Sequence, residues 1–386
     1  MSGIMDTFVK ASSTKLDIKR YQSHKFCYDM QENSVIEYDV DKEVEWENKG
    51  ETDNIKQARN LSDKVEQLKS TNQESWFKYF LDGSRHTYKV DDISIGRDVY
   101  PILAGQVGIS CCGRKNKRMY REKFERKLVL SIPTRAITKE NYKEKEAKLI
   151  CEKINQSENL KKRNLEIGEI LLYKIDGDDK LDKKGIAKIQ DYMIEQEKKA
   201  VMELVDAGKL NKNSFLIKDG SLEYKATQNN HMNLTEAKMK NAFQYVIGVS
   251  KSFNPALCKV KGGGTNSRIV ANLKENERTP ACCYKSEISG SGVTFCVWYL
   301  RLRDSKYTQN VFDGVVKVEK LVQENEKKNG VNSELIDTIS AFLLLERNPV
   351  AYGKDSRWAN HLYPVYVTES FAKSKYMAND TFLKLF

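Results

Sequence analysis

The chain has 386 residues, of which 40% are hydrophobic and 31% are charged, and its formal net charge is +11. It contains no uncharged apolar run near the ~20 residues that a membrane helix needs, and its first residues lack the apolar core of a signal peptide, so we expect a cytoplasmic protein that does not enter a membrane. The excess of basic residues favours a polyanionic partner, of which nucleic acid is the commonest inside cells.

The first third of the chain predicts a helix and then three strands. Apolar residues recur at helical spacing through residues 54–71. Three later segments have the alternation and the aromatic or β-branched content of strands, and they predict a meander: WFKYFLDGS (76–84), VYPILAGQVGISCC (99–112) and RKLVLSIP (126–133). Asp82-Gly83-Ser84 is expected to end the first of them, because Asp-Gly is a common turn dipeptide.

The middle of the chain predicts a charged insert followed by a long helix. Residues 138–164 are rich in lysine and glutamate and predict an exposed helix, and residues 167–175 predict a strand. The acidic stretch at 176–185 lacks the glycine and the terminal glutamate of a calcium loop, so we interpret it as a solvated turn. A further helix is expected from Ile186 to Ala207, with Gly208 as its C-cap.

The last part of the chain predicts four strands and two helices. The strands are expected at 213–219, 244–252, 292–304 and 311–321. An amphipathic helix with an Asn or Ser cap is expected at 331–346, and a last helix from Glu369 to Phe386. Strands and helices in this order favour one α/β domain with a mixed sheet.

The spacing of the cysteine and histidine residues argues against several common metal and catalytic sites. None of the eight cysteines forms a C-x-x-C pair, so we expect free thiols rather than a structural zinc site. Neither the H-E-x-x-H motif of zinc proteases nor the G-x-S-x-G motif of serine hydrolases is present. The remaining candidates for chemistry are carboxylates.

The tripeptide Asp-Gly-Ser follows two apolar runs, at Asp82 and at Asp219. Two hairpin turns would explain this repetition. A second explanation is a metal site, because carboxylates at the ends of neighbouring strands lie only about 5 Å apart, and magnesium and manganese prefer such ligands. The segment after Asp219 does not resemble a returning strand, which favours the metal site there.

The helix before Asp219 offers a third acid. Glu197 lies four residues after Met193 and four before Val201, on the apolar face of the helix. A carboxylate that faces a core costs several kcal/mol unless it is paired or binds a metal. A salt bridge to a buried basic residue is the alternative, and Glu195 and Glu203 remain open as substitutes.

These motifs together resemble the NurA nucleases. The resemblance covers roughly residues 60–386, and it rests on D-G-S at 82–84, an acidic helix, LIKDGSL (216–222), VIGVSKS (246–252), VFDGVVKVE (311–319) and YPVYVTESFAKS (363–374). It implies an RNase H-like core related to the PIWI domain, and manganese- or magnesium-dependent cleavage of DNA by exonuclease and single-strand endonuclease activities. It also implies a homodimer that works with a HerA-type hexameric ATPase.

The resemblance assigns metal-binding carboxylates to Asp82, Asp219 and, through the helix, Glu197. The family usually has a histidine after the Tyr-Pro element, and this chain has none there. Glu369 or His361 is therefore expected to supply the fourth ligand. Lys251 is a candidate catalytic residue that would reach a DNA phosphate or the attacking water, although an ordinary lysine at a strand end is an equal alternative.

Several basic residues are candidates for binding DNA. Arg85 and Lys218 flank the two aspartates and would neutralise a scissile phosphate. The basic run that contains Arg114, Lys115 and Arg118 also carries Tyr120, and cations beside a ring suit single-stranded DNA. A solvated basic loop is an equally good explanation of this run.

We therefore expect an α/β fold with an RNase H-like mixed sheet flanked by helices. Residues 1–70 are expected to form an N-terminal extension with a helix, and residues 71–386 a nuclease domain with a charged insert at about 138–185. The predicted function is a two-metal DNA nuclease in end processing or anti-phage defence. The alternatives are a non-cleaving RNase H/PIWI-like module that binds nucleic acid, and an adaptor of the ATPase.

Overall fold

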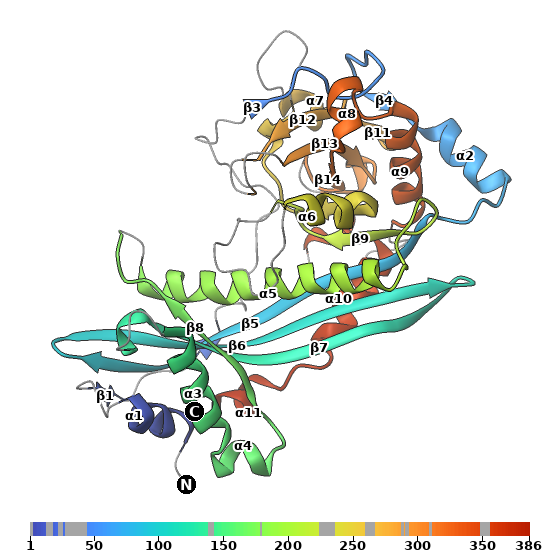
Figure 1. The fold of residues 1–386 in the computed structure, drawn as a ribbon. Helices are drawn as coiled ribbons and strands as arrows, with labels where there is room; N and C mark the ends of the chain where they lie inside the picture. The colour runs from blue at the N-terminus through green and yellow to red at the C-terminus, as the bar shows by residue number, and fades with distance from the viewer. Residues whose placement is uncertain are drawn as a thin grey trace.

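The computed structural model of the chain is built around one large sheet (Figure 1). It describes residues 3–12, 18–21, 26–27, 45–137, 143–177, 180–223, 236–258, 267–286, 289, 293–308, 311–347 and 356–386. Three long strands run side by side across the lower part of the view in Figure 1, and the remaining elements lie along them, with one group above and another below.

Five strands form the centre of the sheet. β5 (Phe77–Ile95), β6 (Asp98–Lys115) and β7 (Arg118–Pro133) form an antiparallel meander, as the sequence predicts. β9 (Phe215–Asp219) then pairs with β5 in parallel, and β10 (Val246–Ser250) pairs with β9 in parallel. The spatial order β10-β9-β5-β6-β7 confirms the predicted α/β fold with an RNase H-like mixed sheet flanked by helices.

Both ends of this central sheet are extended. Beyond β10 follow β14 (Val315–Leu321), β13 (Thr294–Arg301), β12 (Cys282–Lys285) and β3 (Glu45–Trp46), all antiparallel, and β8 (Ile167–Tyr173) lies parallel to β7. Four short strands pair outside this order: β1 (Ile18–Tyr21), β2 (Phe26–Cys27), β4 (Arg59–Asn60) and β11 (Glu277–Arg278). Segments from the first 60 residues thus pair with the main sheet.

Helices cover both faces of the sheet. α5 (Leu181–Asp206) packs on the face that contains Leu81, and α9 (Ser333–Leu345) and α10 (Tyr363–Lys373) pack on the face that contains Phe80 (Figure 1). A separate core lies under α1 (Ile4–Ser12), α3 (Lys143–Asn155), α4 (Glu158–Lys162) and α11 (Asn379–Leu383). The shorter helices are α2 (Ser62–Ser70), α6 (Glu236–Ala242), α7 (Ser267–Ala271) and α8 (Glu324–Asn329).

The prediction that Asp82-Gly83-Ser84 ends the first strand is wrong. β5 continues to Ile95, and Asp82 pairs with Ser110 of β6 inside the ladder. The turn comes instead after Ile95, where Gly96 has a φ of +63°. The long alternating stretch after residue 84 pairs along its whole length with β6, and this pairing outweighs the local turn preference of Asp-Gly.

Several predicted helix boundaries also differ from the structure. Helix α2 begins only at Ser62, and α5 begins five residues earlier than predicted, at Leu181. The predicted exposed helix at 138–164 is two helices that each bury one apolar side, with Ile150, Ile154 and Leu160 in the core, and residues 138–142 lie outside the described part. The last predicted helix is interrupted between α10 and α11. The C-cap of α5 is Ala207 and not Gly208 as predicted, but Gly208 follows it with a φ of +66°, the left-handed conformation that glycine favours just after a helix.

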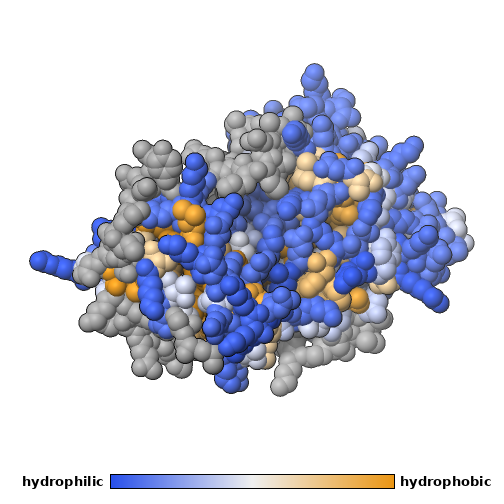
Figure 2. Space-filling model, turned by 60° about the horizontal axis from the view of Figure 1, so that its bottom comes forward, coloured by the Kyte–Doolittle hydropathy of each residue, from blue (hydrophilic) through white to orange (hydrophobic). Residues whose placement is uncertain are grey.

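The surface carries scattered apolar residues. On the face in Figure 2 they form small separate patches among hydrophilic residues. The large exposed apolar side chains come from different elements and include Val99, Tyr120, Leu149 and Tyr307. Among the described residues, no helix is both long enough and apolar enough to cross a membrane.

Candidate functional site

The candidate site lies where β9 separates from β5. Their pairing ends at Leu81 and Lys218, so Asp82 and Asp219 are the next residues on two adjacent parallel strands. Asp219 is the last residue of β9, and Gly220 turns the chain away with a φ of +88°. The register therefore places the two aspartates side by side, although only Asp219 ends a strand.

Alternation along the strands assigns these residues to the two faces of the sheet. Leu81 packs against the α5 side, whereas Phe80 packs on the α10 side. Asp82 alternates with Leu81 and thus faces α10, and Ser84 on the same face hydrogen-bonds Tyr376, which follows α10 (Oγ to Oη 2.6 Å).

Three further charged residues complete this side of the site. Lys251, directly after β10, places Nζ 2.7 Å from Oδ2 of Asp219 and 3.1 Å from Oε2 of Glu369 on α10. Lys373, one turn further along α10, places its Nζ 2.6 Å from the other oxygen of Glu369. One ammonium group therefore joins the end of β9 to α10.

Asp82 is the carboxylate of the cluster whose negative charge is least stabilised by its surroundings. Only 5% of it is exposed, and its Oδ2 has no hydrogen-bond partner within the described ranges. Burial, together with the nearby charges of Asp219 and Glu369, raises its pKa well above the ordinary value, against the opposing effect of Lys251. This carboxylate would gain from a cation that the cluster itself does not fully provide.

The pKa values of Lys251 and Glu369 are shifted in the directions that favour the charged form of each group. Burial opposes the charged form of Lys251, but Asp219, Glu369 and Asp82 outweigh it and raise the lysine pKa. Burial likewise opposes ionised Glu369, but Lys251 and Lys373 outweigh it and lower the pKa of the glutamate well below its usual range. Both groups are therefore charged at neutral pH.

Glu197 approaches from the opposite face. It is 2% exposed, and its Oε2 lies 2.9 Å from Nζ of Lys218. A Cβ added to Gly83 would lie only 2.3 Å from Oε1 of Glu197, so only glycine at this position leaves room for the carboxylate beside β5. Burial raises the pKa of Glu197, and Lys218 and the Gly83 N–H lower it in part.

The structure distinguishes Glu197 from the two glutamates left open by the sequence. Glu203 pairs with Lys123 at the surface, and Glu195 is only partly buried. Glu197 alone of the three reaches the strands that carry Asp82 and Asp219, and its charge influences the pKa of Asp82.

Glu319 is a residue that the sequence analysis missed. It is fully buried on β14, where Oε2 accepts hydrogen bonds from Oγ of Ser221 (2.7 Å) and the N–H of Leu222 (2.6 Å). Lys317 lies 2.6 Å from its other oxygen. Glu319 thus fixes the turn that follows Asp219. The feature of the sequence that could have identified Glu319 is the charged segment K-V-E-K (317–320) within an otherwise apolar strand.

The chemical type of the side chains in this cluster suits a divalent cation that prefers oxygen ligands. Asp82, Asp219 and Glu369 are carboxylates on one face, and one oxygen of Asp82 is buried and has no partner among the residues that the structure describes. In the described part of the chain, however, no three His, Cys, Asp or Glu side chains are already arranged to hold a metal. Lys251 lies between two of the carboxylates, so metal binding would require its ammonium to move.

Other predicted site residues lie apart from this cluster. His361 precedes α10, more than two helical turns before Glu369, and its ring stacks on Tyr366 at 5.8 Å. Arg85 faces α5, where its Nε donates to Gln190. Arg114 forms a bidentate pair with Glu346 and donates to a backbone carbonyl, which indicates a structural role.

The basic run forms the β6–β7 hairpin. Lys115 pairs with Arg118 at its tip, five residues beyond Ser110, which corresponds to about 17 Å along the strand from the level of Asp82. Tyr120 is 42% exposed, and its ring covers Gly113 on β6. These side chains form a basic and aromatic surface that the structure does not bring to the carboxylates.

Comparison with known proteins shows similarity in structure but not in sequence. No family model matches the sequence, and no curated protein matches it. The crystal structure of the NurA nuclease from Sulfolobus solfataricus aligns with a TM-score of 0.43 and 10% identity, over 84% of this chain and 90% of that chain.

Proposed function

We propose that the protein is a divalent-metal-dependent nuclease that cleaves DNA. The observation that carries the proposal is the gathering of Asp82, Asp219 and Glu369 on one face, with a buried carboxylate oxygen that has no partner among the described residues. Manganese or magnesium bound there would activate water and stabilise the leaving oxygen in phosphodiester cleavage. The net charge of +11 supports a polyanionic substrate.

The residues of the chain have distinct roles in this proposal. Asp82, Asp219 and Glu369 would hold the metal, and Glu197 would supply a further carboxylate across the backbone of Gly83. Lys251 would release the carboxylates and turn its ammonium toward a substrate phosphate. His361 stays a less favoured ligand, since its ring packs on Tyr366.

Metal-dependent cleavage is the direct test. End-labelled single- and double-stranded DNA would be incubated with the purified protein in Mn²⁺, Mg²⁺ or EDTA. We expect cleavage only with metal, a loss of cleavage in Asp219→Asn, and retained cleavage in the surface variant Glu203→Gln. Absence of cleavage by pure protein, alone and with a HerA-type ATPase, would reject the proposal.

A second candidate function is binding of nucleic acid without cleavage. It is favoured by Lys251, whose ammonium lies between Asp219 and Glu369 as a built-in cation. Isothermal titration with Mn²⁺ separates the two functions, because a non-cleaving module would bind DNA yet show no metal binding that depends on Asp82 and Asp219.

The biological setting is a further part of the proposal. A homodimer that receives DNA from a HerA-type translocase would act in end processing or anti-phage defence, either as the nuclease or as an adaptor of the motor. Co-purification with the ATPase, followed by measurement of cleavage with and without ATP, tests this partnership.

A further inference from the structure

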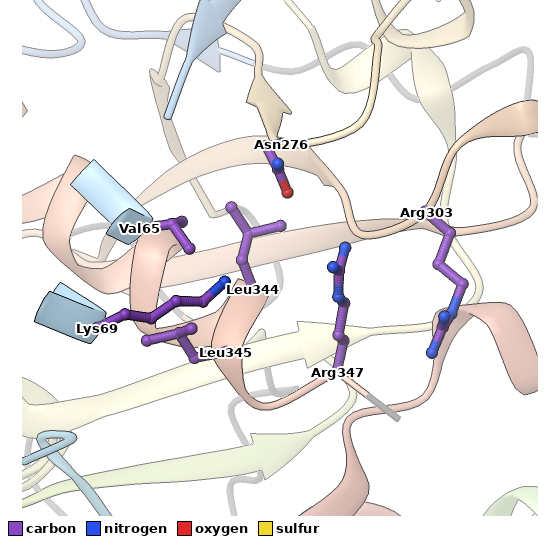
Figure 3. A pocket seen from close by; sticks show the side chains of 7 residues that line it. All are labelled: Val65, Lys69, Asn276, Arg303, Leu344, Leu345 and Arg347. Carbon is purple, nitrogen blue, oxygen red and sulfur yellow. The ribbon is translucent and has the colours of Figure 1, made fainter. Parts of the chain in front are cut away.

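A cationic pocket lies between α2 and the end of α9, and none of its lining residues belongs to the carboxylate cluster. Its volume is about 400 Å³, within the range of small-molecule sites. It is lined by Val65, Lys69, Asn276, Arg303, Leu344, Leu345 and Arg347 (Figure 3). These residues come from separate parts of the chain that the fold brings together.

Positive charge in this pocket exceeds negative charge. Lys69, Arg303 and Arg347 contribute cations, and no carboxylate occurs among the described residues that line the space. Among the described residues, the acid that pairs with one of these cations is Glu275, and its Oε1 lies 2.6 Å from Nη1 of Arg347. Within the described part of the chain, three cations against one paired carboxylate leave an excess of two positive charges.

Arg303 has donors that the described protein groups do not satisfy. Its Nε and one terminal nitrogen are buried and have no hydrogen-bond partner, while its guanidinium lies over the ring of Trp358 at 5.0 Å. Burial lowers the pKa of Arg303, and the neighbouring Arg347 lowers it further. Arg303 lines the pocket, and among the described residues no carboxylate forms a direct ion pair with its guanidinium, so its positive charge is available to an anion there.

The rest of the lining is suited to the organic part of a ligand. Val65, Leu344 and Leu345 form an apolar wall beside Lys69 (Figure 3). The oxygen of Asn276 is turned toward the space, and its amide nitrogen lies 3.4 Å from Oγ of Ser62 (Figure 3). The pocket therefore offers cations for an anion, an apolar surface for a ring, and an acceptor for an amino or hydroxyl group.

We propose that this pocket binds a nucleoside phosphate, with the phosphate between Lys69, Arg303 and Arg347 and the nucleoside against Leu344 and Leu345. Guanidinium groups bind phosphate through paired hydrogen bonds, and two of them with an ammonium suit a dianionic monoester better than a single carboxylate. The phosphate could belong to a free nucleotide or to the end of a DNA strand. This inference does not depend on the nuclease proposal.

Calorimetric titration of the full chain tests the site, with EDTA present so that metal-bridged binding at the carboxylates is excluded. We expect dAMP to bind with a dissociation constant below about 1 mM, and deoxyadenosine and malonate to bind at least about tenfold more weakly. Arg303→Gln should weaken dAMP about tenfold or more, since a hydrogen bond to a charged group contributes that much.

Lys69 and Lys64 provide a matched pair of variants on one helix. Lys69 is exposed at the pocket, whereas Lys64 pairs with Glu334 outside it. Lys69→Gln should weaken dAMP about threefold to tenfold, and Lys64→Gln should leave it unchanged. Because Lys69 is exposed, its variant also answers the question if Arg303→Gln fails to fold.

Oligonucleotides then distinguish the two sources of phosphate. If a 5′-phosphorylated pentathymidylate displaces dAMP and the unphosphorylated one does not, the ligand is a strand end; if neither does, it is a free nucleotide. The inference is overturned if dAMP does not bind, if malonate binds equally well, or if Lys69→Gln and a folded Arg303→Gln both bind dAMP like the wild type.

Discussion

Glu197 and Gly83 meet at the point where β5 and β9 separate. A Cβ on Gly83 would lie 2.3 Å from Oε1 of Glu197, a distance that no side chain tolerates without movement. Because β9 no longer pairs with β5 beyond Leu81, the glutamate can approach the strand backbone there. The glycine after Asp82 therefore serves contact between a helix and a strand, and not a turn.

Replacement of Gly83 by alanine should displace Glu197 and weaken both stability and activity. The buried carboxylate would lose its contact with the strand, at a cost of about 1–3 kcal/mol in the free energy of unfolding. Urea unfolding in EDTA measures this, and cleavage assays measure activity. Gly168→Ala is the control, since its Cβ would lie at an ordinary 3.5 Å from the Leu128 carbonyl. Equal effects of the two variants would contradict the assigned contact.

Substitution by asparagine should change the stability of the protein in opposite directions at Asp82 and at Asp219. Folding raises the pKa of Asp82, so the folded state binds this proton more tightly than the unfolded state, and stability falls as pH rises above the ordinary value of 3.8. Asp82→Asn resembles the protonated form and should be more stable than the wild type at pH 7 without metal. Its advantage should disappear as pH falls toward 3.8.

Asp219→Asn is the counterpart to that variant. It removes the carboxylate 2.7 Å from Lys251 and should destabilise the protein by about 1–3 kcal/mol. Both variants should abolish metal-dependent cleavage. Thermal unfolding from pH 4 to 8 in EDTA measures the stability of both variants and of the wild type. An Asp82→Asn variant less stable than the wild type at pH 7 would show that the buried charge of Asp82 does not destabilise the folded protein.

Much of the sheet could be predicted because its strands follow local rules. The alternation in β5, β6 and β7 and the apolar runs of β9 and β10 identify strands from neighbouring residues alone. The Asp82 turn prediction failed because pairing with β6 is a long-range interaction that a tripeptide does not reveal.

The site could be predicted only in part for the same reason. Asp82, Glu197 and Asp219 carry signals in the sequence: a repeated tripeptide and an acid on an apolar helix face. Glu319 depends on a partner nearly 100 residues away, and its hydrogen bond to Ser221 spans 98 positions. The pairing of Lys251 with Glu369 likewise spans 118 positions, so only the fold shows it.

Removal of the Lys251 charge should make the protein depend on metal for stability. Lys251→Gln would leave Asp82 and Asp219 without their internal cation, whereas Glu369 would keep Lys373, and this loss should cost about 3–5 kcal/mol in EDTA. Mn²⁺ should restore more stability to this variant than to the wild type, because binding to the folded state alone stabilises it. Denaturant unfolding with and without Mn²⁺ measures both effects. A variant as stable as the wild type in EDTA would exclude Lys251 as the balancing cation.

Glu319→Gln should destabilise the protein without direct contact with a substrate. It would leave Lys317 buried without its partner and weaken the hold on the turn after Asp219, at a cost of about 3–5 kcal/mol. Asp304→Asn is the comparison, because its pair with Lys306 is exposed to solvent and should contribute little to stability. Similar losses in the two variants, measured by urea unfolding, would argue against Glu319 as a structural support.

Tyr120 on the β6–β7 hairpin should contribute to binding of single-stranded DNA. Its ring is 42% exposed near the basic tip formed by Lys115 and Arg118, and stacking of one base contributes about 1–3 kcal/mol. Tyr120→Ala should therefore weaken binding about tenfold or more in fluorescence anisotropy with EDTA, whereas Tyr307→Ala, an exposed tyrosine elsewhere, should not.

Neutralisation of Lys115 and Arg118 should instead reduce the dependence of affinity on salt, because those cations would contact phosphate. If all these variants bound DNA like the wild type, the hairpin would be a solvated loop and the DNA would contact another surface.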